Sequence, residues 1–210
     1  ILTVPLILEK IYKKMILPQL SKTTMKVALN IPLLDSRIYA QIRKKLVDAF
    51  GGRFREVIVG GAAMNEEVTN FLYKIKFPFT IGYGMTECGP LISYDHNDEY
   101  VPGSCGQILK GIMKVRIDSE DPYNKVGEIQ VSGENVMKGY YKNEEATSKV
   151  FTEDGWLRTG DLGTIDADNR IYIRGRSKTM ILGASGQNIY PEEIESKLNN
   201  LPFVMESIII

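Results

Sequence analysis

The chain has 210 residues, with 26 Lys and Arg against 26 Asp and Glu, and 43% of its residues are hydrophobic. The balanced charge argues against a nucleic-acid binder, because such proteins present a basic surface to the phosphates. No apolar run reaches the roughly 18 residues of a membrane-spanning helix. Two cysteines and one histidine argue against a disulfide framework and a His/Cys zinc site, so we expect a globular protein of the reducing cytoplasm.

Both ends of the chain look cut. The first residue is Ile1 and not Met, and residues 207–210 have the composition of a strand that lacks a partner. We therefore expect a segment of a longer protein.

The first half of the chain alternates predicted helices and short buried strands. Apolar residues at helical spacing predict a helix that ends near Pro18 and a second helix over residues 38–50. Residues 57–59 and 79–81 are predicted strands, and a helix with an apolar face over residues 68–75 lies between them. This order is typical of an α/β layer.

From about residue 100 the pattern changes to that of a β protein. Apolar and polar residues alternate over 113–117 and 128–132, and a further strand is predicted at 171–173. A short helix over 144–150, with Asn143 as its N-cap, interrupts the strands. The regular turn signals favour a small barrel or sandwich.

The last part of the chain returns to mixed structure. We expect a strand at 180–182, a glycine-rich loop, a helix that begins at Pro191 and a strand at 207–210. A boundary is expected near Lys178. The fold class is therefore α/β plus β.

The segment over residues 80–90 is the most informative for chemistry. A strand ends in two glycines that flank an aromatic residue, and glycines let a backbone approach a flat ligand closely. Tyr83 could cover a base, while Thr86 and Glu87 could reach a phosphate oxygen and a hard cation such as Mg²⁺. An ordinary β-turn with a capping threonine explains the same spacing.

A second candidate is the segment over residues 154–161. Asp161 follows a Thr-Gly pair, where a carboxylate could accept both hydroxyls of a ribose. An Asx-turn or a helix cap is the alternative.

The third candidate segment covers residues 174–195. Three cations in five positions precede a glycine loop and a helix N-terminus, an arrangement that suits anionic groups but also describes a solvated basic turn. The spacing of a phosphate-binding P-loop does not occur in the sequence. His96, the single histidine, has no nucleophile elbow to serve and is predicted to be a loop residue.

Taken in order, these stretches resemble the adenylate-forming (AMP-binding) superfamily of acyl-CoA synthetases, luciferases and adenylation domains. The matching stretches are GGAAM at 60–64, GYGMTE at 82–87, GEIQVSG at 127–133, VMKGYY at 136–141, GWLRTGD at 155–161 and residues 174–195. Within the superfamily, residues 4–12, 174–178 and 186–191 look most like long-chain fatty-acid–CoA ligases.

The resemblance implies an architecture for the chain. Residues 1–98 would be the C-terminal part of an α/β subdomain, and residues 99–177 would form a small distorted β-barrel of the same large domain. Residues 178–210 would begin a mobile α+β C-terminal domain.

The resemblance also implies a two-step reaction. ATP and a carboxylic acid give an acyl-adenylate and pyrophosphate, and the thiol of CoA then displaces AMP. The implied partners are a fatty acid or another carboxylic acid, ATP with Mg²⁺, and CoA, and a peripheral membrane contact stays open.

Single residues take roles from the same resemblance. The adenine and acyl side would be lined by Gly60, Gly61 and Ala62, and the adenine segment holds Gly82, Tyr83 and Gly84. Tyr83 would stack on adenine, Thr86 would bind the α-phosphate and Glu87 would hold Mg²⁺, so Thr86 and Glu87 are the predicted catalytic residues.

The remaining roles fall in the second half of the chain. Asp161 would bind the ribose diol, with Arg176 beside it. Lys178 would sit at the hinge of the mobile domain, and Gly186 would belong to a loop on the CoA side.

Two parts of the family pattern are absent from the sequence. These are the Ser/Thr/Gly-rich phosphate loop and the lysine near the far C-terminus, so we expect the segment alone to be inactive. The alternatives to a fatty-acid ligase are an amino-acid or aryl-acid adenylating enzyme and a non-catalytic nucleotide-binding homologue.

Overall fold

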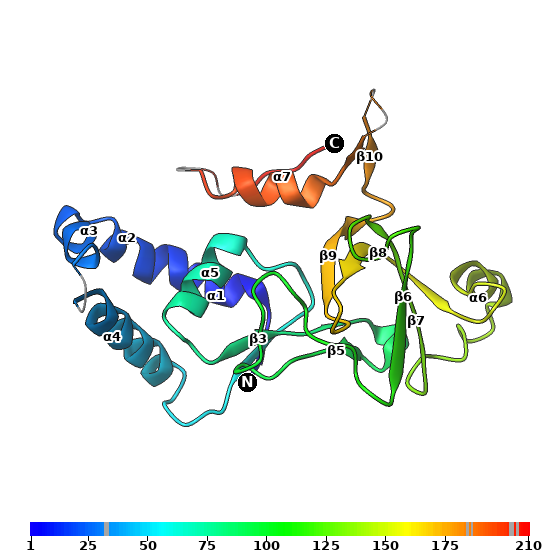
Figure 1. The fold of residues 1–210 in the computed structure, drawn as a ribbon, viewed down its shortest axis with the longest axis horizontal. Helices are drawn as coiled ribbons and strands as arrows, with labels where there is room; N and C mark the ends of the chain where they lie inside the picture. Colours follow the sequence, from blue (N-terminus) through cyan, green and yellow to red (C-terminus); the bar gives the residue numbers. More distant parts are fainter. Residues whose placement is uncertain (32–33, 184, 186, 202–203, 205) are drawn as a thin grey trace. The chain divides into compact units, whose positions relative to one another are not determined.

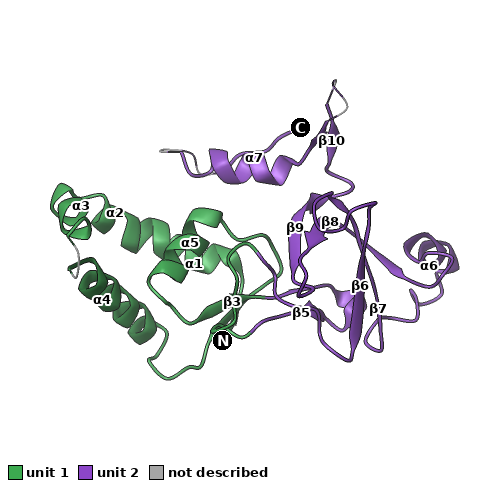
Figure 2. Ribbon diagram, viewed as in Figure 1, with its two compact units in different colours: residues 1–81, 96–103 green, residues 82–95, 104–210 purple. Residues whose placement is uncertain are grey.

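The computed structural model describes residues 1–31, 34–183, 185, 187–201, 204 and 206–210 (Figure 1). The chain divides into two compact units (Figure 2). Unit 1 contains Ile1–Ile81 and His96–Gly103, and unit 2 contains Gly82–Asp95 and Ser104–Ile210. Each unit has its own cluster of buried apolar side chains. The division into three domains over residues 1–98, 99–177 and 178–210 stays a prediction.

Unit 1 is an α/β layer. Its elements are β1 (Leu2–Thr3), α1 (Pro5–Ile11), the π-helical η1 (Tyr12–Ile16), α2 (Leu17–Leu20), α3 (Thr23–Leu29), α4 (Leu34–Ala49), β2 (Val57–Val59), α5 (Glu66–Lys74) and β3 (Phe79–Ile81). The three strands form a parallel sheet in the order β1-β2-β3. The helix predicted to end near Pro18 continues to Leu20 as α1, η1 and α2.

The core of unit 1 explains why α5 packs where it does. Val68, Leu72 and Ile75 are almost fully buried at helical spacing, and Val57 and Val59 of β2 are fully buried. The helix begins at a side-chain cap, because the Asn65 carboxamide oxygen accepts from the backbone N–H groups of Glu67 and Val68. The predicted strands and helices of this half are confirmed.

Unit 2 is mainly antiparallel. Its elements are β4 (Tyr83–Gly84), the 3₁₀ turn η2 (Thr86–Cys88), β5 (Leu91–Ser93), β6 (Met113–Asp118), β7 (Gly127–Gly133), α6 (Glu144–Val150), β8 (Leu157–Ile165), β9 (Ile171–Arg176), β10 (Ile181–Leu182), β11 (Asn188–Ile189) and α7 (Pro191–Leu198). A four-stranded meander runs in the order β6-β7-β8-β9, and β4–β5 and β10–β11 are two-stranded ribbons (Figure 1).

The meander differs from the predicted barrel in one respect. The fold class of α/β plus β is confirmed, but no sheet of the described residues closes on itself, since β6 and β9 are the free ends of the strand order. One face of the meander is closed by apolar side chains such as Ile129, Val131 and Leu157, which are 1% exposed or less. The sheet therefore contributes to the core of unit 2 without closing into a barrel.

The strand predicted over residues 207–210 is wrong. These residues are not in a strand, and their polar groups bind α7 instead. The backbone N–H of Ile209 donates to Glu195 Oε1 at 2.8 Å, and the Ser207 hydroxyl donates to Asn199 Oδ1 at 3.0 Å. Strand composition without a neighbouring strand does not make a strand, because the ladder hydrogen bonds need a partner.

None of the helices in the described part of the chain combines the length and the apolar character that a bilayer crossing requires.

Candidate functional site

Two residues of the predicted nucleotide site form a buried tyrosine–carboxylate pair. Tyr83, in β4, is 7% exposed, and its hydroxyl donates to Asp161 Oδ2 of β8 at 2.7 Å. Asp161 is 6% exposed. The structure thus brings together two residues that lie far apart in the sequence and that were singled out independently.

Arg176 completes this arrangement from the neighbouring strand. The register of β8 and β9 places Asp161 directly opposite Arg176, and Arg176 Nε donates to Asp161 Oδ1 at 2.9 Å. The Arg176 side chain is 66% exposed, whereas that of Asp161 is 8% exposed. An opposite-charge pair across two strands is the expected stabilising contact at such a position.

Each carboxylate oxygen of Asp161 therefore holds one protein donor. Because an ionised carboxylate offers about four acceptor positions, Asp161 keeps acceptor capacity for two further donors. A vicinal diol supplies two hydroxyl donors. The chemistry of Asp161 thus fits the predicted ribose contact.

The protonation of Tyr83 supports its role as a donor. Burial, and then the negative charge of Asp161, raise the pKa of the Tyr83 phenol far above its usual value. A phenol that stays protonated donates to the carboxylate and does not repel it. The predicted stacking of Tyr83 on adenine stays a prediction, and the ring belongs to the apolar cluster of unit 2.

Gly84 is small for a structural reason. A Cβ at this position would lie 1.9 Å from the Pro90 carbonyl oxygen, because β4 and β5 approach closely there. Gly82 lies between β3 and β4. The sequence predicts that a flat ligand approaches the backbone at this glycine. In the structure it is the backbone of Pro90 that approaches Gly84.

Thr86 and Glu87 lie on η2, which follows β4 in the chain. Thr86 is exposed, and Glu87 is half-buried. The Tyr140 hydroxyl donates to Glu87 Oε1 at 2.9 Å. Tyr140 belongs to the matched VMKGYY stretch, but sequence reasoning gave it no role, since no local pattern links positions 87 and 140.

The donor set around Glu87 bears on the expected magnesium. Within the described residues, no group of three or more His, Cys, Asp or Glu side chains is placed to hold a metal ion. Mg²⁺ in nucleotide sites takes only one or two carboxylates, and phosphates and water supply the rest. Glu87 therefore fits a magnesium ion that arrives with a nucleotide.

The other predicted residues are placed as follows. In unit 1, Gly60, Gly61 and Ala62 directly follow β2, and the Gly60 N–H donates to the Thr3 carbonyl at 3.1 Å. In unit 2, Lys178 is an exposed residue of the turn after β9. Gly186 lies outside the described residues.

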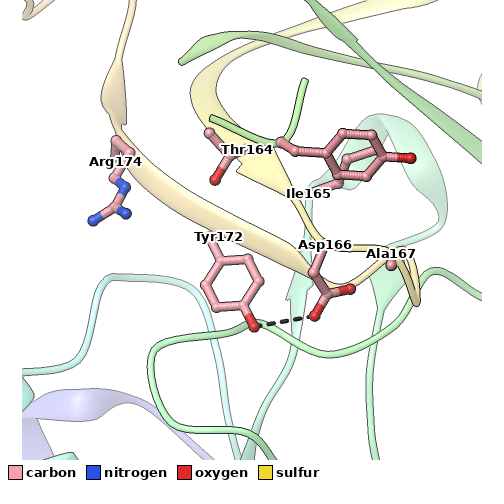
Figure 3. Close-up of a pocket in the computed structure, with 7 residues that line it drawn as sticks. Thr164, Ile165, Asp166, Ala167, Tyr172 and Arg174 are labelled. Atoms are coloured by element: carbon pink, nitrogen blue, oxygen red, sulfur yellow. Dashed lines mark hydrogen bonds between the residues drawn. The ribbon is translucent and has the colours of Figure 1, made fainter. Parts of the chain in front are cut away.

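One hollow of unit 2 is lined by other residues. It measures about 400 Å³ and is lined from β8, β9 and Tyr123, with Tyr172 donating to Asp166 at 3.1 Å (Figure 3). None of the predicted site residues lines it. We therefore assign this hollow no part in the predicted site.

Comparison with known proteins gives a consistent result. The sequence model of a family described as "AMP-binding enzyme" matches residues 1–141. A 4-coumarate-CoA ligase from Narcissus pseudonarcissus is 33% identical over 85% of the chain and 35% of its own length. The long-chain-fatty-acid–CoA ligase FadD15 from Mycobacterium bovis is 32% identical over 80% of the chain and 27% of its own length.

Solved structures show the same likeness. ATP-bound MatB from Rhodopseudomonas palustris matches with a TM-score of 0.68 and 33% identity, over 83% of this chain and 36% of that one. The o-succinylbenzoate CoA synthetase MenE from Bacillus subtilis, in complex with an acyl-adenylate, matches with a TM-score of 0.65 and 29% identity, over 78% of this chain and 36% of that one. The chain thus spans about a third of the length of these proteins.

Proposed function

The chain belongs to the AMP-binding enzyme family, and from that premise we propose that it carries the nucleotide site of an ATP-dependent acid–CoA ligase. In the first step, a carboxylate oxygen of the acid attacks the α-phosphorus of ATP, which releases pyrophosphate and leaves an acyl-adenylate. In the second step, the CoA sulfur attacks the acyl carbon, the bond to AMP breaks and a thioester forms.

The observation that supports this proposal is the Asp161 carboxylate with its two fixed donors. Tyr83 and Arg176 hold one oxygen each, at 2.7 and 2.9 Å. A carboxylate that is oriented before the ligand arrives loses little conformational freedom on binding, which favours affinity for the ribose diol. The Arg176 guanidinium, largely exposed, would also lie near the anionic nucleotide.

The phosphate side of the site would be served by η2. Thr86 would donate its hydroxyl to the α-phosphate, and Glu87 would hold the magnesium ion of the nucleotide. When bound, magnesium neutralises phosphate charge and so favours attack by the acid. MenE from Bacillus subtilis has been solved with ATP and a magnesium ion, which supports ATP and Mg²⁺ as the proposed ligands of this chain.

For the acid, we propose a long-chain fatty acid. The stretches 4–12 and 174–178 resemble fatty-acid–CoA ligases, and FadD15 is among the relatives. An aryl acid is the second candidate, because a 4-coumarate-CoA ligase is equally similar in sequence.

The test is ATP–pyrophosphate exchange by the full protein that contains this chain. Palmitate, 4-coumarate and a mixture of amino acids are supplied separately, and Asp161→Ala is the matched inactive control. Exchange with palmitate, lost in the variant, is the expected result. Exchange with 4-coumarate but not with palmitate would show that the substrate is an aryl acid and not a fatty acid.

The acceptor and the minimal segment are tested in the same assay. CoA should release AMP from the protein that has formed the acyl-adenylate. The 210-residue chain alone should show no exchange above background. ATP binding by the full protein without exchange for any acid would instead indicate a non-catalytic nucleotide-binding homologue.

A further inference from the structure

The Tyr140–Glu87 hydrogen bond joins a predicted catalytic residue to a side chain that has no role so far. The phenol oxygen lies 2.9 Å from Glu87 Oε1, although Tyr140 is 37% exposed and could turn to water. The contact joins residues that are 53 positions apart in the sequence. A surface tyrosine that keeps such a geometry needs a support of its own.

Part of that support comes from the backbone beside Tyr140. The N–H of Met137 donates to the carbonyl oxygen of Glu87 at 2.7 Å. The Asn135 carboxamide donates to the carbonyls of Cys88 at 2.6 Å and Leu91 at 2.9 Å. The segment 135–140 therefore binds both the main chain and the side chain around Glu87.

Tyr140 is itself anchored on α6. Its backbone N–H donates to Thr147 Oγ1 at 2.9 Å, and the same hydroxyl donates to the Asn143 carbonyl at 2.8 Å. Asn143 caps α6 by accepting from the N–H of Ala146 at 3.0 Å. A continuous set of hydrogen bonds thus runs from the capped helix, through Tyr140, to the Glu87 carboxylate.

We propose that Tyr140 is a positioning residue that fixes the Glu87 carboxylate for the cation of a bound metal–nucleotide. The inference rests on the proposed function, because it requires a nucleotide. The hydrogen bond from the phenol to Oε1 would limit rotation of the Glu87 carboxylate, while the remaining acceptor positions would stay open to the cation. Hydrogen bonds to a ligating carboxylate typically change metal affinity by tenfold or more when they are removed.

The chain offers a matched control at the adjacent position. Tyr141 is 88% exposed, and its ring faces the Lys142 ammonium at 5.3 Å. Tyr140→Phe and Tyr141→Phe each remove one phenol oxygen from neighbouring surface tyrosines. Only the first removes a donor from Glu87.

The experiment measures Mn²⁺ binding to the full protein in the presence of ATP, by electron paramagnetic resonance, so the readout does not depend on turnover. Tyr140→Phe should weaken Mn²⁺ binding about tenfold, and Glu87→Gln should weaken it at least as much. Tyr141→Phe should bind as the wild type. Thr147→Val should show a smaller loss in the same direction, with an unchanged circular dichroism spectrum.

The possible failures are distinguishable. Normal Mn²⁺ binding by Tyr140→Phe, or an equal loss in Tyr141→Phe, would overturn the positioning role and leave the proposed function standing. A wild-type protein that binds no Mn²⁺ with ATP would overturn the proposed function, and the positioning role with it.

Discussion

Two tyrosine–carboxylate hydrogen bonds of unit 2 involve predicted site residues, and they have similar lengths in very different surroundings. Tyr83 donates to Asp161 at 2.7 Å, and both residues are at most 7% exposed. Tyr140 donates to Glu87 at 2.9 Å, and Tyr140 is 37% exposed. The oxygen–oxygen distances of the two hydrogen bonds are similar, but the first pair is buried and the tyrosine of the second is exposed. We therefore expect the loss of each hydrogen bond to have a different effect.

The difference lies in what replaces a lost partner. At an exposed site water takes the place of a missing donor or acceptor, so the net contribution of the hydrogen bond to stability is small. In the interior no water is at hand, and a polar group left without a partner keeps its desolvation penalty. We therefore expect the first pair to act on stability and the second to act on ligand binding.

The largest effect should come from a change that disturbs both pairs together. Gly84 lies between Tyr83 and η2, and the Cβ of Gly84→Ala would clash with the Pro90 backbone. Because the clashing atom is backbone, β4 and β5 must separate, and we expect a loss of about 3 kcal/mol in the free energy of unfolding. Urea denaturation of the chain measures it.

The control for this substitution is Gly155→Ala. Gly155 has a φ of +83° and nothing within 4 Å of a Cβ, whereas Gly84 has the close contact and no positive φ, so Gly155→Ala measures the strain of a positive φ without a clash, about 1 kcal/mol. Equal losses in the two variants would show that the β4–β5 approach is not the cause.

The next largest effect should come from Asp161→Ala. The substitution leaves the buried Tyr83 hydroxyl without its acceptor, and we expect a loss of about 2 kcal/mol in the free energy of unfolding. Adding Tyr83→Phe should recover part of the loss, since it removes the unsatisfied hydroxyl. Glu87→Ala should cost less than Asp161→Ala, and the comparison fails if the two cost the same.

The sequence predicts the members of the buried pair but not the pair itself. Tyr83 and Asp161 were each assigned to the nucleotide because of their immediate neighbours. Their mutual hydrogen bond spans 78 positions, and no local spacing encodes such a contact. Tyr140 was missed for the same reason.

The fold shows where local signals suffice and where they fail. The helix over 144–150 and its Asn143 cap were predicted, because cap and periodicity are adjacent in the sequence. The Thr-Gly pair before Asp161 predicts no strand, whereas Asp161 lies inside β8, where every residue from 161 to 165 is buried. A strand buried on both faces shows no alternation of apolar and polar residues.

A smaller effect is expected from alkaline pH, through the raised pKa of Tyr83. The pKa of Tyr83 is raised in the folded chain, so its contribution to stability is complete below the unfolded value of about 10 and falls as pH rises above it. Tyr83→Phe should therefore flatten the fall in the free energy of unfolding between about pH 10 and 12. Urea denaturation across this range measures the slope, and a slope equal to that of the wild type would contradict the assignment.

The smallest effect on stability should come from Tyr140→Phe. The pKa of Tyr140 is raised mainly by its hydrogen bond to Glu87, but in the variant water can donate to the half-buried Glu87 carboxylate instead. We expect the free energy of unfolding to change by less than about 0.5 kcal/mol, as for most surface substitutions. The same protein should bind Mn²⁺ with ATP about tenfold more weakly. A stability loss as large as that of Asp161→Ala would mean that the exposed pair holds the fold, and the contrast between the two pairs would then be lost.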